Sequence, residues 1–476
     1  MQRQINSING IDWLTVILYA LMVLMGWLNI YATVADEQNA GVFSLSQRYG
    51  KQLVWIVTAI GLAVLVCLLD PRFYSSFAYP VYVFCMFVLI AVLVVGKEVN
   101  GARSWFDIGS VRLQPSEFAK VAVSLALAKY LGNYSGKLMQ FKNLILVGII
   151  IFLPPVFIIL QPDTGSSLVY LAFLIVLYRE GLPQEILLFG LLTVVLFILS
   201  LLMQNVQAYL AGGLILLGFT VYYLKSRQIK NVLKGLGVFM LIFSILFTVN
   251  FLAEIGFDIH EILLGAALTA SVIFVAYSIV RRLPNIRTII LFILCALVFT
   301  FSVDFVFTKM LGSHQQKRIQ VMLGIESDPL GIEYNVDQSK IAIGSGGLTG
   351  KGYLQGTQVR GKFIPEQSTD FIFCTIGEEW GFAGTAVTVI LFIVLLLRLV
   401  YIAERQRSVF GRVYSYCVVS ILFFHYAINI GMTIDLVPVI GIPLPFFSYG
   451  GSSLWAFTVL LFIMLRLDAS RNEYIR

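Results

Sequence analysis

The sequence predicts an all-α polytopic membrane protein, and its composition, apolar runs and charge placement all support this fold class. Of its 476 residues, 59% are apolar and only 12% are charged, about half the charged fraction of an ordinary soluble domain. Apolar runs of roughly 18 residues or more recur along the chain, long enough to cross a hydrocarbon layer of about 30 Å. Lys and Arg are scattered between these runs, so the formal charge of +7 indicates membrane topology and not nucleic-acid binding.

We expect about fourteen transmembrane helices, which make residues 1–476 a single integral membrane domain. The first apolar run lacks a small-residue cleavage pattern after it, so it is retained as a span. The expected spans lie near Trp13–Tyr31, Leu53–Leu69, Ala78–Val95, Ser116–Leu131, Leu144–Leu160, Ser166–Tyr178, Ile186–Met203, Tyr209–Leu224, Val232–Leu252, Ile262–Val280, Ile289–Phe307, Phe382–Leu399, Val413–Met432 and Ser453–Leu465.

Charge sets the expected orientation. With the N-terminus inside, the inner loops hold most of the Lys and Arg residues, for example Arg281, Arg282 and Arg287. Both termini are then cytoplasmic, and residues 308–380 form one large extracytoplasmic loop. Its apolar and aromatic content predicts an ordered structure against the membrane surface.

Ionisable residues concentrate on this outer face, which a pure scaffold does not need. Besides the large loop, the outer segments are GKEVNGARSWFDIGSVRLQPSEFAK, QPDTG at residues 161–165, and VPVIGIPLPFFSYGGSS before the last span. The histidines and cysteines show no metal-ligand spacing, and no Walker motif or Ser/His/Asp arrangement is present. The sequence therefore argues against ATP hydrolysis by this chain.

Asp328 is the candidate catalytic residue. It lies in the segment Ser-Asp-Pro-Leu-Gly, where the following proline favours an extended backbone. A carboxylate near a low-dielectric boundary has a raised pKa, which suits a general acid or base. The alternative is ordinary turn chemistry, because Asp and Pro are both common turn residues.

Glu117 and Lys120 lie three residues apart after Pro115, which is well placed for the first turn of a helix. Unpaired charge is costly at or inside the membrane boundary. The pair either neutralises itself or lines a polar cavity that holds an anionic head group; we favour the cavity.

Further candidate groups for an anionic substrate lie in the outer loops. The glycine-rich stretch at residues 344–352 could cradle phosphate oxygens or simply form turns. Trp105 could stack on a sugar or anchor the loop at the interface, and Asp163 is placed to cap a helix. The basic residues that suit a pyrophosphate are Arg103, Arg112, Lys317, Arg318, Lys340, Lys351, Arg360 and Lys362.

An ordered set of motifs over most of the chain resembles the SEDS family of shape, elongation, division and sporulation proteins. The motifs are GARSW, VRLQPSEFAK, QPDTG, ESDPLG, QSKIAIGSGGLTGKG, GTQ, PEQSTDFIF, GEEWG and PLPFFSYGGSS. The stretch from GSGGLTGKG to the TDFIF motif is most similar to the rod-shape branch of the family.

The resemblance implies a peptidoglycan glycosyltransferase acting on lipid II. The 4-hydroxyl of an acceptor GlcNAc would attack C1 of the donor MurNAc with inversion, and undecaprenyl pyrophosphate would leave. It further implies that Asp328 is essential, that Trp105 is functionally important, and that Arg112, Gln114, Glu117 and Lys120 form a polar cluster at the fourth span. The implied partner is a class B penicillin-binding protein, which supplies transpeptidation.

Two departures from the family pattern stand out. Ser368 precedes the TDF triplet where the family commonly has His. Residues 186–287 are interpreted as about four helices inserted into a core of about ten spans. An even number of added spans keeps the large loop outside.

Two other functions stay open: a flippase for lipid-linked precursor, and a non-catalytic cell-wall scaffold. Against the flippase, no internal repeat is found and the polar residues do not lie at the midplane. No cofactor is evident, although a divalent cation such as Mg²⁺ needs few protein ligands and stays an alternative.

Overall fold

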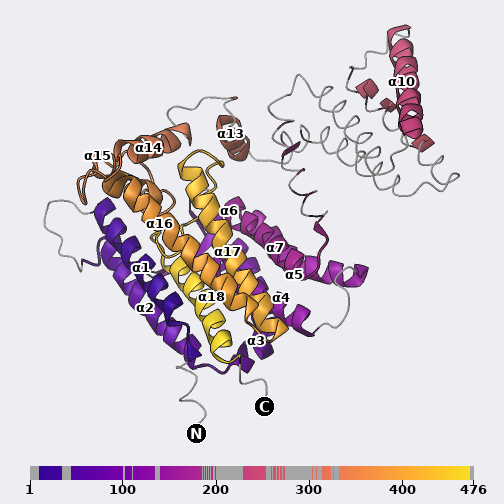
Figure 1. The fold of residues 1–476 in the computed structure, drawn as a ribbon. Coiled ribbons are helices and arrows are strands. Elements are labelled where there is room, and N and C mark those ends of the chain that lie inside the picture. Colours follow the sequence, from indigo (N-terminus) through magenta and orange to yellow (C-terminus); the bar gives the residue numbers. More distant parts are fainter. Residues whose placement is uncertain are drawn as a thin grey trace. The chain divides into compact units, whose positions relative to one another are not determined.

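The computed structural model describes residues 10–34, 44–99, 102–109, 111–133, 140–184, 229–252, 313–322 and 332–471, with isolated positions within 186–199, 259–273 and at 303, 307 and 325 (Figure 1). Contacts divide the chain into two compact units. The first is formed by Met1–Pro183 and Ser327–Arg476, and the second by Gln184–Glu326.

The first unit is a helical bundle with a small three-stranded sheet. Its elements are α1 (Trp13–Val34), α2 (Arg48–Leu68), α3 (Pro71–Val95), β1 (Lys97–Val99), β2 (Ala102–Ile108), β3 (Val111–Leu113), α4 (Pro115–Asn133), α5 (Phe141–Ile159), α6 (Thr164–Leu168), the 3-10 helix η2 (Val169–Ala172), α7 (Phe173–Arg179), α14 (Ile332–Ser345), α15 (Thr357–Arg360), α16 (Ile372–Glu404), α17 (Val409–Thr433) and α18 (Gly451–Ala469). The second unit contains α10 (Ile229–Leu252) and α13 (Ser313–Met322).

In the described part of the chain, eight helices are long and apolar enough to cross a membrane: α1, α2, α3, α5, α10, α16, α17 and α18. This confirms a multi-pass helical membrane protein. The predicted spans near residues 186–203, 209–224, 262–280 and 289–307 lie outside the continuously described residues. The total of about fourteen spans and the inserted segment 186–287 therefore stay predictions.

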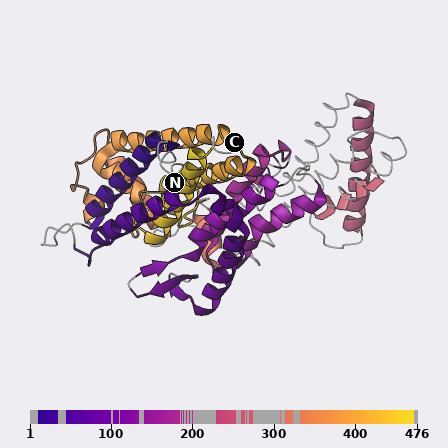
Figure 2. The same ribbon diagram turned by 90° about the horizontal axis from the view of Figure 1, so that it is seen from below.

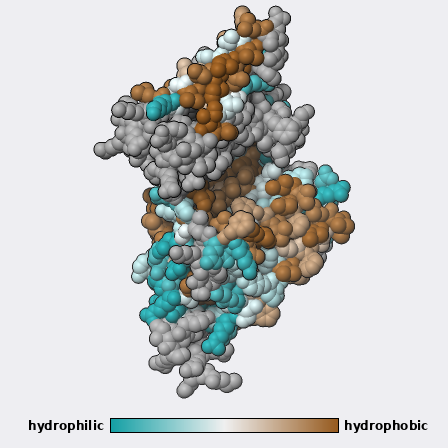
Figure 3. All heavy atoms as spheres, turned by 90° about the vertical axis from the view of Figure 1, so that its right-hand side faces the viewer, coloured by the Kyte–Doolittle hydropathy of each residue, from teal (hydrophilic) through white to brown (hydrophobic). Residues whose placement is uncertain are grey.

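Burial separates central from peripheral helices in the first unit. In the most apolar stretches of α18 and α17, 78% and 67% of residues are buried, against 22% in α2 and α3. The predicted span at Ser116–Leu131 is helix α4, which is buried over most of its length although it carries three charged residues. Broad exposed areas of apolar side chains, as in Figure 3, are the expected surface for contact with lipid.

The predicted span at Ser166–Tyr178 is interrupted. It consists of α6, η2 and α7 in succession, which together cover Thr164–Arg179. Asp163 is the N-cap of α6, where its Oδ1 accepts the backbone N–H of Ser166 at 3.1 Å. The predicted capping role of Asp163 is thereby confirmed.

The outer segment before α4 folds into an antiparallel sheet with the order β1-β2-β3, which we did not predict (Figure 2). Lys97 lies opposite Trp105, and Asp107 lies opposite Arg112. Gly109 makes the turn between β2 and β3 with a φ of 65°, a left-handed conformation that glycine adopts without strain. The sheet delivers the chain directly to the first residue of α4.

Ion pairs join the first and last helices at one end of the bundle. Asp12, just before α1, accepts hydrogen bonds from Arg398 Nη2 at 2.5 Å and Arg405 Nη2 at 3.2 Å. Arg405 also pairs with Asp468 of α18. Burial opposes ionisation of Asp12, but the bonds from Arg398 and Thr15 outweigh it and hold the pKa of this carboxyl below its usual value.

This lowered pKa predicts a pH dependence of stability. A carboxyl whose pKa falls on folding stabilises the fold above its unfolded-state pKa, and the stabilisation is lost as pH falls through the folded-state pKa. We expect the Tm in detergent to fall on acidification from pH 7 to pH 3. The Asp12→Asn variant should have a lower Tm than the native protein at pH 7, and its Tm should fall less between pH 7 and pH 3. An equal acid dependence in both proteins would contradict this assignment.

Candidate active site

A buried ion pair lies at the centre of the candidate site, on the first turns of α4. Lys120 Nζ donates to Glu117 Oε2 at 2.9 Å, and the two side chains are only 1% and 4% exposed. The structure thus shows the self-neutralising ion pair, the alternative that we did not favour, and in this conformation the two side chains do not line an open cavity. Because the ion pair is sealed inside the protein, Lys120 is not accessible to a ligand in this conformation, and its charge is offset by that of Glu117.

His425 of α17 completes this group and was not singled out by the sequence. Its Nε2 lies 2.9 Å from Lys120 Nζ, and its Nδ1 lies 3.2 Å from the carbonyl oxygen of Pro443. A carbonyl oxygen only accepts, so we assign the proton to Nδ1, which leaves Nε2 to accept from the ammonium group. Lys120 Nζ also lies 4.9 Å from the ring centroid of Phe457 on α18, a favourable cation–π distance.

Gln114 and Asp163 form a second, more accessible polar group beside the ion pair. Gln114 Nε2 donates to Asp163 Oδ2 at 2.9 Å, and Ser166 Oγ donates to the same oxygen at 2.8 Å. The backbone N–H of Gln114 donates to Ser452 Oγ at 3.1 Å, and this hydroxyl donates to the carbonyl of Arg112 at 2.9 Å. Helices α4, α6 and α18 therefore meet here, and Gln114, Glu117, Lys120 and Asp163 come together as one site.

The sheet carries three further candidates at this end of the bundle. Arg103 lies 3.6 Å from Glu98, and Arg112 lies 3.5 Å from Asp107. Both distances exceed ordinary hydrogen-bond length, and both arginine side chains are about 60% exposed (60% and 58%). Trp105 on β2 is partly exposed. These three side chains are exposed enough to contact a ligand, whereas the side chains of Glu117 and Lys120 are buried.

The glycine-rich segment is occupied by contacts with α16. The backbone N–H groups of Lys351 and Gly352 donate to the carbonyls of Glu378 and Glu379, each at 3.0 Å. Gly350 has a φ of 80°, and a Cβ there would lie 2.1 Å from the carbonyl oxygen of Glu379. These glycines therefore allow two backbones to approach closely, and these two amides do not face a phosphate.

The Lys351 ammonium and the two adjacent glutamates also have structural contacts. Lys351 Nζ bonds to Glu378 Oε1 at 2.7 Å, and the Glu378 carboxylate accepts the backbone N–H groups of Gln358 and Val359 at 2.9 Å. Glu378 thus caps α15, whereas Glu379 is buried beside it and makes no comparable bond. The structure therefore does not form a carboxylate pair for catalysis from these two residues.

Of the remaining candidates, Lys340 lies in the described part of the first unit. Lys340 on α14 bonds to Asp435 at 2.8 Å and Asp337 at 3.0 Å, and these bonds raise its pKa. Arg318 lies on α13 of the second unit. Asp328 lies outside the described residues, so its catalytic role stays a prediction.

Ser368, which departs from the family pattern, has a partner that the sequence did not reveal. Arg48, the first residue of α2, donates from Nη1 to Ser368 Oγ at 2.6 Å. The carbonyl of Ser368 accepts the N–H of Tyr449 at 2.8 Å. The position before the TDF triplet thus connects α2 to the loop preceding α18.

The fold and this site define a multi-pass membrane protein with a polar centre where the three-stranded sheet meets the helix bundle. The chain belongs to the family of FtsW, RodA and SpoVE, described as cell cycle proteins, whose pattern matches residues 12–212 and 213–473. This is the SEDS family that the motifs resemble.

Curated relatives support the same assignment. The peptidoglycan glycosyltransferase RodA of Treponema pallidum is 31% identical over 467 residues, covering 98% of this chain and 99% of the relative. The peptidoglycan glycosyltransferase MrdB of Escherichia coli K12 is 32% identical over 437 residues, covering 91% of this chain and 88% of the relative.

The fold also matches a solved structure described as "Structural coordination of polymerization and crosslinking by a peptidoglycan synthase complex". The TM-score is 0.62 at 24% identity, with 98% of this chain and 99% of the other covered.

The glycine contacts predict a selective effect of added methyl groups. Gly350→Ala forces both a strained φ and a backbone clash, so we expect a loss of at least about 2 kcal/mol of stability. Gly344→Ala is the matched control, because a Cβ there meets nothing within 4 Å. Thermal unfolding in detergent measures both, and equal Tm values for the two variants would refute the close-approach explanation.

The buried ion pair predicts non-additive mutations. Lys120→Met alone leaves Glu117 buried without its charge partner, and should cost about 3–5 kcal/mol. Adding Glu117→Gln replaces the unpaired buried carboxylate by a neutral amide and should recover most of the lost free energy of unfolding. The exposed Glu98→Gln serves as control and should change stability by less than about 1 kcal/mol. Additive losses in a double-mutant cycle would show that the pair is not coupled.

Proposed function

We propose that this protein polymerises lipid II into peptidoglycan strands during cell elongation and releases undecaprenyl pyrophosphate. The observation that carries the proposal is the identity of about one third (31% and 32%) along nearly the whole chain with relatives named peptidoglycan glycosyltransferases. These names favour a polymerase over a flippase or a scaffold. The polar site adds physical support, because its exposed arginines suit an anionic, sugar-bearing substrate.

In the proposed reaction, the O4 oxygen of the acceptor GlcNAc attacks C1 of the donor MurNAc from the face opposite the leaving group. The C1–O4 bond forms with inversion while the bond between C1 and the pyrophosphate oxygen breaks. The O4 proton passes to the carboxylate of Asp328, acting as general base. Undecaprenyl pyrophosphate leaves with the bonding electron pair.

The described residues suggest how the protein assists this step. Arg112 and Arg103 are exposed on the sheet and would hold anionic groups of the donor. Trp105 would stack on a sugar face. Gln114 and Asp163 would position hydroxyl groups, and the buried Lys120–Glu117 pair would hold the start of α4 in place for them. We derive no step through a divalent cation; in the described ranges no three His, Cys, Asp or Glu side chains form a metal-binding group.

We further propose a bacterial inner-membrane location with both termini cytoplasmic and the active face periplasmic. In support, Asp12 before α1 and Asp468 near the end of α18 share Arg405, so these two chain segments lie at the same end of the bundle. Arg179, Arg398 and Arg412 also form ion pairs at helix ends, as the positive-inside rule favours. The proposed partner is a class B penicillin-binding protein, since a structurally similar chain belongs to a complex of polymerization and crosslinking.

The decisive test supplies labelled lipid II to the full-length protein in detergent, with and without the penicillin-binding partner. We expect a ladder of glycan products on a gel. Asp328→Ala should lower the rate by about 100-fold or more, as expected for loss of a general base, while the Tm stays near that of the native chain.

Asp337→Ala provides the matched control, because Asp337 is a half-exposed carboxylate within the same segment 308–380; it should retain the ladder. If the native protein yields no ladder under any condition, with the partner and Mg²⁺ present, the polymerase assignment is wrong and a flippase or scaffold is favoured.

A further inference from the structure

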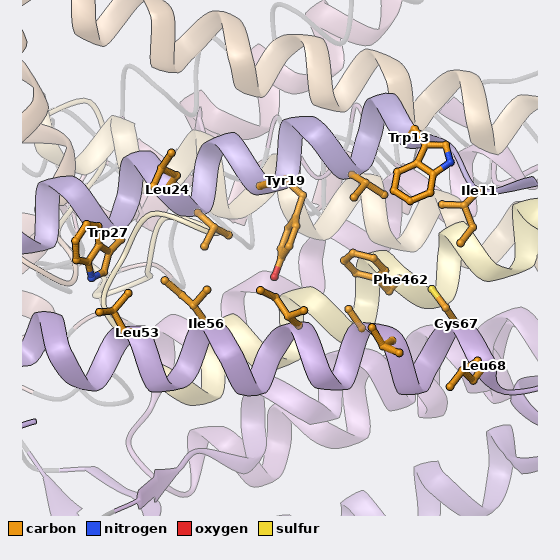
Figure 4. Close-up of a pocket in the computed structure, with 16 residues that line it drawn as sticks. Ile11, Trp13, Tyr19, Leu24, Trp27, Leu53, Ile56, Cys67, Leu68 and Phe462 are labelled. Carbon is orange, nitrogen blue, oxygen red and sulfur yellow. The ribbon is translucent and has the colours of Figure 1, made fainter. Parts of the chain in front are cut away.

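A deep apolar groove runs along the first two helices of the bundle. It encloses about 620 Å³ and is lined by α1, α2 and Phe462 of α18 (Figure 4). None of its lining residues is charged. From Trp13 to Trp27 along α1, the helical rise gives a length of about 21 Å, most of a hydrocarbon layer. The small side chains of Ala20 and Ala63 leave room for a ligand between the helices.

Two of the polar groups near the groove already have partners in the protein. Tyr19 bonds through its hydroxyl to Thr458 Oγ1 at 2.9 Å, and the indole N–H of Trp27 donates to the carbonyl of Tyr49 at 3.1 Å. The groove therefore offers mainly dispersion contacts along its length. A flexible hydrocarbon chain fits this chemistry, whereas a sugar or a peptide backbone does not.

One end of the groove adjoins a positive charge. Trp27 and Leu53 lie at this end (Figure 4), and the bond from Trp27 reaches the residue next to Arg48. Arg48 is 47% exposed, and its ion pair with Glu366 is long at 3.7 Å. Its guanidinium lies 5.9 Å from the ring of Tyr449, and both Arg48 and Arg112 act electrostatically on that tyrosine.

The start of α2 adds to this positive potential. Its N-cap residue, Gln47, makes no side-chain capping bond, so the partial positive charge of the helix N-terminus is not offset by a side chain there. An anion placed at Arg48 would thus meet a guanidinium and a helix terminus together. Arg112 would supply a second guanidinium toward the same loop.

We infer that the α1–α2 groove and Arg48 form one binding site for a polyprenyl pyrophosphate lipid, with the hydrocarbon tail in the groove and the pyrophosphate at Arg48. The inference rests on the proposed function for the identity of the lipid. It assigns Arg48, Ala20 and Ala63 to substrate or product binding, and it places the head group beside Ser368 and Tyr449.

The test measures binding of labelled undecaprenyl pyrophosphate to the full-length protein in nanodiscs of phosphatidylcholine. Arg48→Gln should raise the Kd by about ten- to a hundredfold, as expected for loss of a charge-assisted hydrogen bond. Ala20→Phe should fill the groove and also weaken binding. The matched controls are Arg72→Gln, in the first turn of α3 beyond the far end of α2, and Ile17→Phe, at an exposed position of α1 that does not line the groove; both should bind as the native chain does.

Three outcomes would overturn the inference: unchanged binding in Arg48→Gln, unchanged binding in Ala20→Phe, or equal competition by phosphatidylglycerol, which would indicate a general site for anionic lipids. The same nanodiscs, with the penicillin-binding partner and Mg²⁺ added, are supplied with lipid II in parallel. If the native protein yields a ladder but neither variant changes the binding of undecaprenyl pyrophosphate, the proposed groove site is refuted and the polymerase assignment stands. Native binding without any ladder refutes the polymerase alone.

Discussion

The buried charge pair on α4 is the constraint around which the helix bundle is arranged. An ammonium and a carboxylate without water are tolerated only when each finds a partner. Glu117 and His425 provide those partners from α4 and α17, and the ring of Phe457 on α18 covers the ammonium. Three central helices must therefore be in register before Lys120 is satisfied. The accessible polar group of Gln114 and Asp163 is positioned as a consequence, because it follows from the same alignment of α4 with its neighbours.

Periodic and compositional features of this chain were readable from the sequence. The apolar runs predicted the long helices, Pro115 predicted the start of α4, and the spacing of Glu117 and Lys120 predicted that they are neighbours on one helical face. Asp163 was recognised as a helix cap from its local sequence. All of these depend on interactions between residues near one another in the chain, for which spacing alone carries the information.

Long-range contacts could not be read in the same way. His425 is 305 residues from Lys120, and Arg48 is 320 residues from Ser368; no local pattern marks either pair. The role of the glycine-rich segment was ambiguous in the sequence for a related reason. A sequence such as GSGGLTGKG is compatible with a phosphate loop or with close backbone packing, and the choice is made by α16, which supplies carbonyl acceptors at Glu378 and Glu379. The three-stranded sheet was likewise missed, since its strands are only three to seven residues long.

The ion pairs of Asp12 have a consequence for biosynthesis. Arg398 and Arg405 follow Asp12 by 386 and 393 residues, and Asp468 is close to the end of the chain. During translation, α1 enters the membrane long before these partners exist. The carboxylate of Asp12 must therefore stay hydrated, or be bound by another factor, until α16 has been inserted. The bundle is thus closed beside the start of α1 by side chains that are synthesised 386 and 393 residues later, so nascent chains that lack them should be open to quality control at this end.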